Sequence, residues 1–247
     1  MNKNIHIVIL AAGKGTRLNS VEHPKVMLEV GHQPMLGYLL DEFAKIKQAE
    51  MIVVVGFQGE KVRDFVGRRA KIVWQKEQRG TADAVLSAQA ILKDESGTTV
   101  IVAGDHPLVR ARTILQLVEI SEEKDALALA VYDGNNHEDF GRVVTDSEGH
   151  VQKIVEAVNA TPAELKIERR NSSIYAMPNI WLWSLLKKIR PNPVTGEYYL
   201  TDMIQLAIKA GRKVVAVGLT DPNEALGINT PDQLSRVRSV LDKIESN

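Results

Sequence analysis

The sequence predicts an α/β protein, a three-layer sandwich in which helices cover both faces of a mostly parallel, mixed sheet. Short runs rich in valine and isoleucine alternate with stretches that carry apolar residues at helical spacing, which is the pattern of β-α-β units. The runs are nearly continuous in apolar residues, as in strands buried on both faces. The 247 residues, 44% of them hydrophobic and 25% charged, have ordinary globular composition and suffice for one large domain.

The first half of the chain is expected to contain four strands and four helices. The strands are predicted at 5–10, 51–55, 72–74 and 99–103, where β-branched and apolar residues follow one another. The helices are predicted at 34–48, 60–66, 81–92 and 112–122. The first of these helices has apolar side chains at helical spacing, at Met35, Leu39, Phe43 and Ile46.

In the second half of the chain, polar turns connect the predicted strands. Strands are predicted at 126–132, 142–145, 151–155 and 168–176, and they would extend the sheet in an antiparallel or mixed manner. A helix at 180–189, a loop rich in proline and glycine at 190–197, a helix at 201–210, a strand at 214–217 and a helix at 231–245 are expected to follow. Thr230 is the expected N-cap of the last helix. No Ser/Gly-rich linker separates the halves, so we expect one domain with two lobes.

Composition excludes several classes of function. The chain has 31 Lys and Arg against 31 Asp and Glu, so net charge does not favour nucleic acid or an anionic membrane as partner. It has no Cys, which excludes disulfides, thiolate metal sites and cysteine nucleophiles. The longest apolar runs are about six residues, too short for a membrane-spanning helix. The first residues do not have the organisation of a signal peptide. We therefore expect a soluble, cytoplasmic protein with small-molecule partners.

The first chemical motif follows the first predicted strand, at residues 10–18 (LAAGKGTRL). Ligands of open α/β sheets bind at the carboxyl ends of strands, near a topological switch point. Gly13 and Gly15 let the backbone bend sharply and bring its N–H groups close to a phosphate chain, and Arg17 adds a cationic side chain. The motif is neither a P-loop nor the dinucleotide fingerprint, because Leu18 stands where a third glycine would be. The motif therefore predicts a phosphate site of another kind.

A second motif, Pro24 followed by Lys25, stands within ten residues of the first. Together the two resemble the signature of the sugar-1-phosphate nucleotidyltransferases. Further segments narrow the resemblance: 75–81 (QKEQRGT), 103–108 (AGDHPL), 140–142 (FGR), 155–156 (VE), 196–202 (GEYYLTD) and 227–229 (GIN). They are similar to the N-acetylglucosamine-1-phosphate uridyltransferase branch, specifically the N-terminal pyrophosphorylase domain of its bifunctional bacterial members. The resemblance covers nearly the whole chain, from about residue 5 to about residue 240.

The resemblance implies a fold and a reaction. The fold is the nucleotide-diphospho-sugar transferase type, with a Rossmann-like sheet, a nucleotide-binding lobe at 1–125, a sugar-binding lobe at 126–229 and a C-terminal helix at 230–247. The reaction is an in-line attack of N-acetylglucosamine-1-phosphate on the α-phosphate of UTP, which gives UDP-N-acetylglucosamine and pyrophosphate. Such chemistry requires positioning and charge neutralisation more than covalent catalysis.

The resemblance also implies a role for individual residues. Arg17 and Lys25 would be catalytic, with Lys25 bridging the α-phosphate and the incoming sugar phosphate. Asp105 and Asn229 would hold one Mg²⁺ cofactor, an ion that keeps several waters and so needs few protein ligands. The implied nucleotide-binding residues are Leu10, Ala11, Ala12, Gly13, Gly15, Thr16, Gln75, Gly80 and Thr81. The implied sugar-binding residues are Gly141, Glu156, Asn171 and Tyr199.

Four departures from the family pattern leave parts of the function open. Residues 80–83 read GTAD where the family commonly has GTGH, 155–160 read VEAVNA where V-E-x-K-D-A is usual, and 171–173 read NSS where N-[ST]-G is usual. These changes leave the sugar open, so the same chemistry with glucose-1-phosphate, a galactosamine phosphate or dTTP is an alternative. The chain also ends at Asn247 without hexapeptide repeats, so we expect neither the acetyltransferase activity of the bifunctional enzyme nor its trimer.

Two alternatives come from other classes of protein. A regulator that binds nucleotide sugars without turnover would be expected to lose the bridging lysine or the metal carboxylate, and both are present. A nicotinamide-dependent enzyme lacks support, because no acidic residue ends the second predicted strand. The six histidines have no ligand spacing, and none is predicted to be catalytic. The oligomeric state is left open between a monomer and a dimer.

Overall fold

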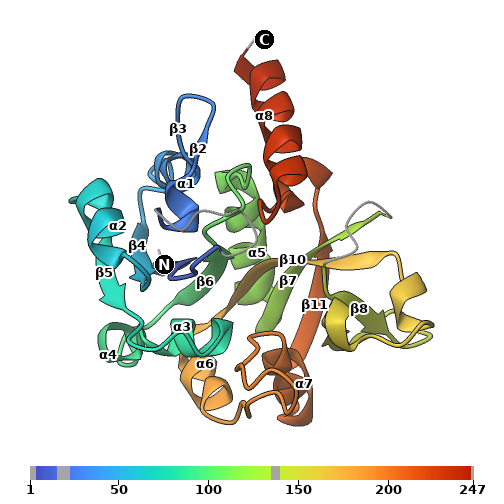
Figure 1. The fold of residues 1–247 in the computed structure, drawn as a ribbon. Helices are drawn as coiled ribbons and strands as arrows, with labels where there is room; N and C mark the ends of the chain where they lie inside the picture. The colour runs from blue at the N-terminus through green and yellow to red at the C-terminus, as the bar shows by residue number, and fades with distance from the viewer. Residues whose placement is uncertain (1–3, 16–22, 135–139, 246–247) are drawn as a thin grey trace.

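One mixed sheet of nine strands forms the centre of the fold in the computed structural model, which describes residues 4–15, 23–134 and 140–245 (Figure 1). Seven of the strands lie in the order β11-β7-β10-β6-β1-β4-β5, and β8 joins β10 to β9. The strand bounds are β1 (Ile5–Ala11), β4 (Ala49–Val55), β5 (Lys71–Trp74), β6 (Thr98–Ala103), β7 (Ala126–Asp133), β8 (Arg142–Thr145), β9 (Val151–Val155), β10 (Arg169–Pro178) and β11 (Lys213–Gly218). The sheet runs through both predicted lobes, whose division stays a prediction.

The directions of the strands confirm a mostly parallel, mixed sheet. Strands β6, β1, β4 and β5 pair in parallel, and so do β7 and β11. Strand β10 lies between β6 and β7 and is antiparallel to both. Because Leu10 pairs in register with Ala103, the segments that follow β1 and β6 leave the sheet side by side.

Helices cover both faces of the sheet, as a three-layer sandwich requires (Figure 1). Their bounds are α1 (Met35–Phe43), α2 (Gly59–Val66), α3 (Thr81–Leu86), α4 (Gln89–Leu92), α5 (Ala111–Lys124), α6 (Asn179–Leu186), α7 (Asp202–Lys209) and α8 (Pro231–Glu245). Alternate residues of β1 point to opposite faces: Val8 packs in the core beneath α3, α4, α6 and α7, whereas Ile7 and Ile9 pack in the core beneath α1, α2 and α5. The predicted three-layer α/β class is therefore confirmed.

Three local predictions need correction. The helix predicted at 34–48 is shorter: it ends at Phe43, and it begins after Pro34, which lies in strand β3 (Gln33–Pro34). Strand β3 forms an unpredicted hairpin with β2 (Glu29–Val30). The helix predicted at 81–92 is divided into α3 and α4. Strand β5 was expected to be buried on both faces, but it pairs with β4 alone at the edge of the sheet, and Trp74 is 41% exposed. An apolar run does not reveal whether its strand is central or at an edge.

The predicted N-cap of α8 is confirmed. The Gln233 backbone N–H donates to Thr230 Oγ1 at 3.3 Å, and the Thr230 backbone N–H donates to Gln233 Oε1 at 3.0 Å, a reciprocal capping box. Gln233 Oε1 also accepts from the Asn229 backbone N–H at 2.6 Å. The start of α8 thus fixes the backbone of Asn229.

No helix within residues 4–15, 23–134 and 140–245 is both long and apolar enough to cross a membrane.

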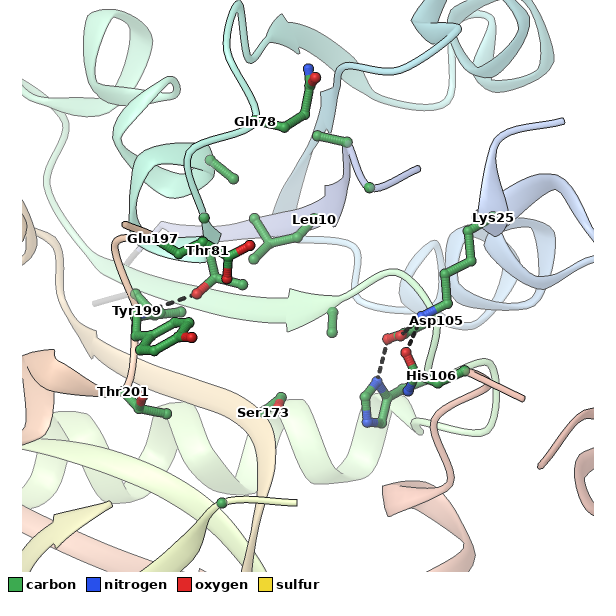
Figure 2. Close-up of a pocket in the computed structure, with 18 of the residues that line it drawn as sticks. Leu10, Lys25, Gln78, Thr81, Asp105, His106, Ser173, Glu197, Tyr199 and Thr201 are labelled. Carbon is green, nitrogen blue, oxygen red and sulfur yellow. Dashed lines mark hydrogen bonds and ion pairs between the residues drawn. The ribbon is translucent and has the colours of Figure 1, made fainter. Parts of the chain in front are cut away.

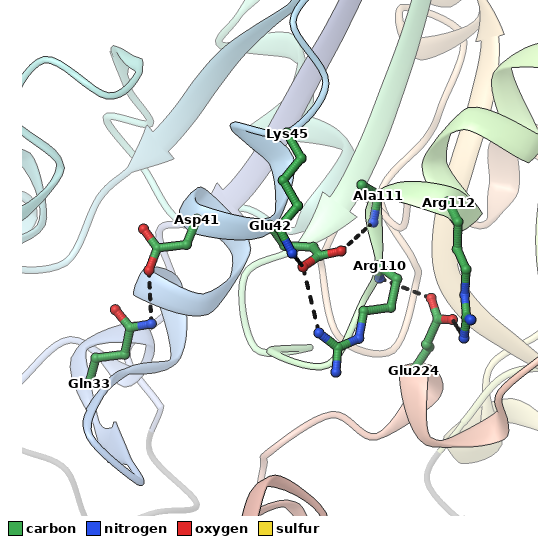
Figure 3. Close-up of polar contacts among 8 residues, drawn as sticks. All are labelled: Gln33, Asp41, Glu42, Lys45, Arg110, Ala111, Arg112 and Glu224. Atoms are coloured by element: carbon green, nitrogen blue, oxygen red, sulfur yellow. Dashed lines mark hydrogen bonds and ion pairs between the residues drawn. The ribbon is translucent and has the colours of Figure 1, made fainter. Parts of the chain in front are cut away.

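Two carboxylates fix the start of α5 and the loop that precedes it (Figure 3). Glu42 of α1 accepts from the Ala111 backbone N–H, and Glu224 of the short 3₁₀ helix η5 (Pro222–Ala225) accepts from the Arg110 backbone N–H, both at 3.0 Å. These N–H groups lie at a helix start, where no intrahelical acceptor is available. Glu224 is fully buried and contacts Arg112 at 3.4 Å. The loop between β6 and α5 is therefore held from two other elements.

Candidate active site

A cavity of about 640 Å³, lined by both apolar and polar residues, opens at the carboxyl ends of β1 and β6 (Figure 2). Thirteen of the predicted site residues line it: Leu10, Ala12, Gly13, Lys25, Gln75, Gly80, Thr81, Asp105, Gly141, Glu156, Asn171, Tyr199 and Asn229. Ala11 is instead buried in the apolar core, and Gly15 is not among the lining residues. Thr16 and Arg17 lie outside the described residues. Their predicted roles, and those of Ala11 and Gly15, stay predictions.

One lysine joins two oxygen ligands from distant parts of the chain. Lys25 lies in the 3₁₀ helix η2 (Lys25–Met27), Asp105 follows β6, and Asn229 precedes α8. The Lys25 ammonium donates to Asp105 Oδ2 and, at 2.6 Å, to Asn229 Oδ1. The side chains of Lys25 and Asp105 are 13% and 16% exposed, so the ion pair is largely shielded from water. The fold thus brings together residues 80 and 204 positions apart around a single cation.

His106 supports the Asp105 carboxylate from the other side. Its Nδ1 lies 2.8 Å from Asp105 Oδ1, and because an ionised carboxylate only accepts, Nδ1 is the donor. The ring is buried against Gly227, where an added Cβ would lie 2.9 Å from ring atoms, so that position has no room for a side chain. Burial raises the pKa of Asp105, but Lys25 and His106 outweigh it and hold that pKa far below its usual range. The sequence predicts no catalytic role for His106, although its position directly after Asp105 marks it as a residue of interest.

The two oxygens that meet at Lys25 fit a hard divalent cation. A carboxylate and a carboxamide oxygen are ligands that Mg²⁺ accepts, and Mg²⁺ usually keeps several waters. Among the described residues no group of three or more His, Asp or Glu side chains is arranged to hold a metal. A cation here would therefore be held by Asp105 and Asn229 together with oxygens from water or substrate.

The other end of the cavity is built by two backbone segments that pair with each other. The Tyr198 backbone N–H donates to Arg79 O at 2.8 Å, and Tyr198 O accepts from the Ala82 backbone N–H at 3.0 Å. Gly80 lies between them with φ +116°, and a Cβ there would stand 2.6 Å from Tyr198 O. Only glycine therefore fits at this position. Thr81 Oγ1 accepts from the Leu200 backbone N–H at 2.9 Å and extends the pairing into the cavity wall.

Asn171 and its neighbours form a polar wall on β10. Asn171 Nδ2 donates to the Tyr175 hydroxyl at 2.6 Å, and Asn171 Oδ1 accepts from the Ser173 backbone N–H at 3.1 Å. The Asn171 backbone N–H donates to Gly141 O at 2.9 Å, which ties β10 to the segment before β8. Tyr199 comes from a separate segment, and its hydroxyl lies 2.9 Å from Thr195 Oγ1.

Ser173 keeps a backbone conformation that favours glycine. Its φ is +60°, at an irregularity of β10 between Asn171 and Tyr175. A left-handed conformation costs a residue with a Cβ roughly 1–2 kcal/mol. Ser173 lines the cavity (Figure 2), so its side chain takes up space that a glycine would leave open. Ser173 therefore combines a backbone conformation that suits glycine with a side chain in the cavity wall.

Glu156 is expected to destabilise the folded protein at neutral pH. Burial raises its pKa above the ordinary 4.5, the nearby Asp202 and Glu197 carboxylates raise it further, and the hydrogen bond from Thr201 Oγ1 at 2.7 Å offsets only part of this. Above pH 4.5 the unfolded chain loses this proton first, so ionisation favours unfolding until the pH passes the raised pKa of the folded state. Replacing Glu156 with glutamine removes this cost.

Glu156→Gln is therefore expected to raise the Tm at pH 7–8 by about 2–4 °C for each kcal/mol removed, and to have little effect below pH 4.5. Thermal unfolding from pH 4 to pH 8 measures the difference. Glu119→Gln, at an exposed position of α5, is the matched control and should change the Tm little at any pH. A Glu156→Gln protein that is less stable than the wild type at neutral pH would refute the burial argument.

A mostly parallel sheet with a cavity at the carboxyl ends of its strands is the architecture of α/β proteins that bind small ligands. The sequence profile described as Nucleotidyl transferase matches residues 6–222. The chain therefore belongs to the nucleotidyl transferase family and is a nucleotidyltransferase.

Within the nucleotidyl transferase family, the chain is similar to bifunctional bacterial proteins. It is 34% identical over 242 residues to the bifunctional protein GlmU of Enterococcus faecalis, covering 98% of this chain and 53% of that protein. It is 40% identical over 237 residues to the bifunctional protein GlmU of Heliobacterium modesticaldum, covering 95% and 51%. The predicted resemblance to bifunctional bacterial enzymes is thus confirmed. The chain spans about half the length of the curated relatives it matches.

A solved structure has the same fold. The crystal structure of a UDP-glucose pyrophosphorylase complexed with UDP-glucose matches with a TM-score of 0.77, covering 97% of this chain and 99% of that chain. The two sequences are 17% identical, so the likeness speaks for the fold alone. It agrees with the predicted Rossmann-like sheet of the nucleotide-diphospho-sugar transferase type.

Proposed function

We propose that the protein transfers a uridylyl group from UTP to N-acetylglucosamine-1-phosphate and releases pyrophosphate, with Mg²⁺ as cofactor. The observation that carries the proposal is that the Lys25 ammonium donates to both Asp105 and Asn229, and that all three residues line the same cavity. The similarity to GlmU proteins over nearly the whole chain supports the same reaction class. The balanced charge supports small-molecule substrates, and we place the reaction in the cytoplasm.

The phosphates would lie near Lys25 and the turn after β1. Lys25 would bridge the α-phosphate and the incoming sugar phosphate and so offset the repulsion between two anions. Gly13 and Lys14 line the same part of the cavity and would face the remaining phosphates together with Arg17. Asp105 and Asn229 would hold Mg²⁺, which supplies positive charge to the phosphate oxygens when bound. Holding the reactants in line is the main task left to the protein.

The sugar would lie at the end of the cavity formed by Gly141, Glu156, Asn171 and Tyr199. Glu156 has one carboxylate oxygen on Thr201 and would offer the other to a sugar hydroxyl. Ser173 lies in the same wall, so a bound sugar would have to leave room for its side chain. Since Ser173 departs from the family pattern, the same reaction with another sugar-1-phosphate is the second candidate.

Release of pyrophosphate tests the proposal directly. We expect the fastest turnover with UTP, Mg²⁺ and N-acetylglucosamine-1-phosphate, in a panel that also contains glucose-1-phosphate, galactosamine-1-phosphate, CTP and dTTP. Higher activity with another sugar phosphate would assign the sugar end to that substrate. Binding of UTP without turnover on any sugar phosphate would favour a non-catalytic regulator. Neither binding nor turnover with any member of the panel would refute uridylyl transfer.

A further inference from the structure

Gln75 is held in one orientation by two acceptors. Its side chain is 4% exposed, lines the cavity, and donates from Nε2 to Gly80 O at 3.1 Å and to Asp83 Oδ2 at 2.9 Å. A backbone carbonyl and an ionised carboxylate can only accept, so only the amide nitrogen can face them. Both hydrogens of Nε2 are used in these contacts. A rotated amide would place Oε1 against two other acceptors and lose both hydrogen bonds.

Asp83 is fixed in turn by Arg79. Arg79 Nη2 donates to Asp83 Oδ1 at 2.7 Å, and the Asp83 side chain is 13% exposed whereas that of Arg79 is 55% exposed. The Arg79 guanidinium therefore holds the outer oxygen of the carboxylate, and Gln75 holds the inner one. Asp83 itself is absent from the residues that line the cavity. Its hydrogen bond to Gln75 is what connects it to the cavity wall.

The consequence is a hydrogen-bond acceptor in the cavity wall. With both Nε2 hydrogens committed, Oε1 is the polar atom that Gln75 offers to the cavity, and no donor among the described residues contacts it. An acceptor at that place pairs with an N–H group. Uracil and thymine carry an N–H at ring position 3, whereas cytosine has a lone pair there and would face a second acceptor.

We propose that Asp83, clamped by Arg79, is a positioning residue that keeps Gln75 Oε1 toward the nucleotide base and so makes the site select bases with an N3–H group. The inference rests on the proposed function, in which Gln75 faces the base. It adds a specificity role for Asp83, a residue that stands where the family pattern commonly has histidine. Asp83 and Arg79 would be needed for the choice of base. They would not be needed for binding the phosphates.

Asp83→Ala tests the inference because it removes one of the two acceptors that hold the Gln75 amide and leaves Gly80 O as the other. We expect the preference for UTP over CTP, measured as the ratio of kcat/KM values, to fall by about tenfold, the usual effect of one lost hydrogen bond to a charged group. The change should lie mainly in KM. The preference for UTP over dTTP should stay unchanged, because both bases carry the same N3–H. Titration calorimetry with UTP and CTP, without sugar phosphate, gives the same comparison in the absence of turnover.

Two further variants make the result specific. Arg79→Ala removes the outer support of Asp83 from an exposed position, together with the contacts of Arg79 with Glu77 and the Tyr198 ring. It should shift the UTP to CTP ratio in the same direction by a smaller factor. It also serves if Asp83→Ala does not fold. Asp64→Ala removes a carboxylate that pairs with Arg63 on the surface of α2 and lies outside the cavity lining, so it should leave all ratios unchanged. A merely structural role of Asp83 would lower activity with UTP, CTP and dTTP alike.

The outcomes separate this inference from the proposed function. Wild-type turnover with UTP and a lower UTP to CTP ratio in both variants would support both. Wild-type turnover with UTP and an unchanged ratio in the variants would overturn the role of Asp83 and leave the proposed function standing. A wild-type protein that binds CTP as well as UTP would overturn the inference at once. A wild-type protein that binds neither nucleotide would overturn both.

Discussion

Replacing Lys25 with alanine is expected to lower kcat/KM by about 10²–10³-fold, the effect of losing a transition-state charge contact of about 3–4 kcal/mol. The Lys25 ammonium is the cation that Asp105 and Asn229 share in the cavity, and its side chain is only 13% exposed. Shielding from water strengthens the interaction of an ammonium with phosphates. Rates of pyrophosphate release over a range of UTP and sugar-phosphate concentrations give kcat/KM and measure the loss.

The matched control for Lys25 is Lys71→Ala. Lys71 is 57% exposed on the edge strand β5, where it pairs with Glu50 outside the cavity lining. The control should keep full activity, because exposed ion pairs contribute about 1 kcal/mol or less. Circular dichroism and thermal unfolding establish that the Lys25→Ala protein is folded, since Asp105 loses a partner in it. A folded Lys25→Ala protein with more than half the wild-type activity would remove Lys25 from the mechanism.

Replacing Asp105 with asparagine is expected to shift the Mg²⁺ dependence of the reaction to about 10- to 100-fold higher concentration, because a carboxylate ligand contributes charge that an amide does not. Asparagine has the same shape, so the fold should be preserved. His106 Nδ1 can still donate to the Oδ1 position. Titration of the nucleotide-free protein with Mg²⁺, followed by calorimetry, measures the weakened binding without reference to turnover.

The control for Asp105 is Asp94→Asn. Asp94 is 87% exposed and is paired only loosely with its neighbour Lys93, with an N–O distance of 3.7 Å. Its replacement should change neither the Mg²⁺ titration nor the activity. If Asp105→Asn lowered activity while the Mg²⁺ titration stayed at the wild-type midpoint, Asp105 would not be a metal ligand. Its role would then be limited to holding Lys25.

Some elements follow from the sequence and others do not, for identifiable reasons. The strands at β1, β4 and β6 are predictable because apolar, β-branched runs are a local property of the chain. The hairpin of β2 and β3 contains two residues in each strand, too few to produce a periodic pattern. The exposure of Trp74 depends on β5 having only one neighbour in the sheet, which no local pattern reveals.

In the candidate site, too, some residues are predictable from the sequence and others become evident only in the structure. Motif resemblance predicted Lys25, Asp105 and Asn229, and the structure adds that one ammonium contacts both oxygens. Resemblance gave no role to Asp83, because the residue departs from the family pattern. Its contact with Gln75 depends on α3 packing beside the end of β5, whereas its pairing with Arg79 lies within four residues of the chain.

The sequence alone predicts the α/β class, most of the strands and helices in their order, the family, and the segments that carry polar side chains after β1 and β6. Three features follow only from the packing of the chain: β10 lies antiparallel between β6 and β7, Ser173 has a left-handed backbone in the cavity wall, and Asp105 and Asn229 meet at Lys25. The difference lies in the sequence range of the interactions. Periodicity and capping act over one strand or one helical turn, whereas partners 80 or 204 residues apart meet according to which strands and helices pack together.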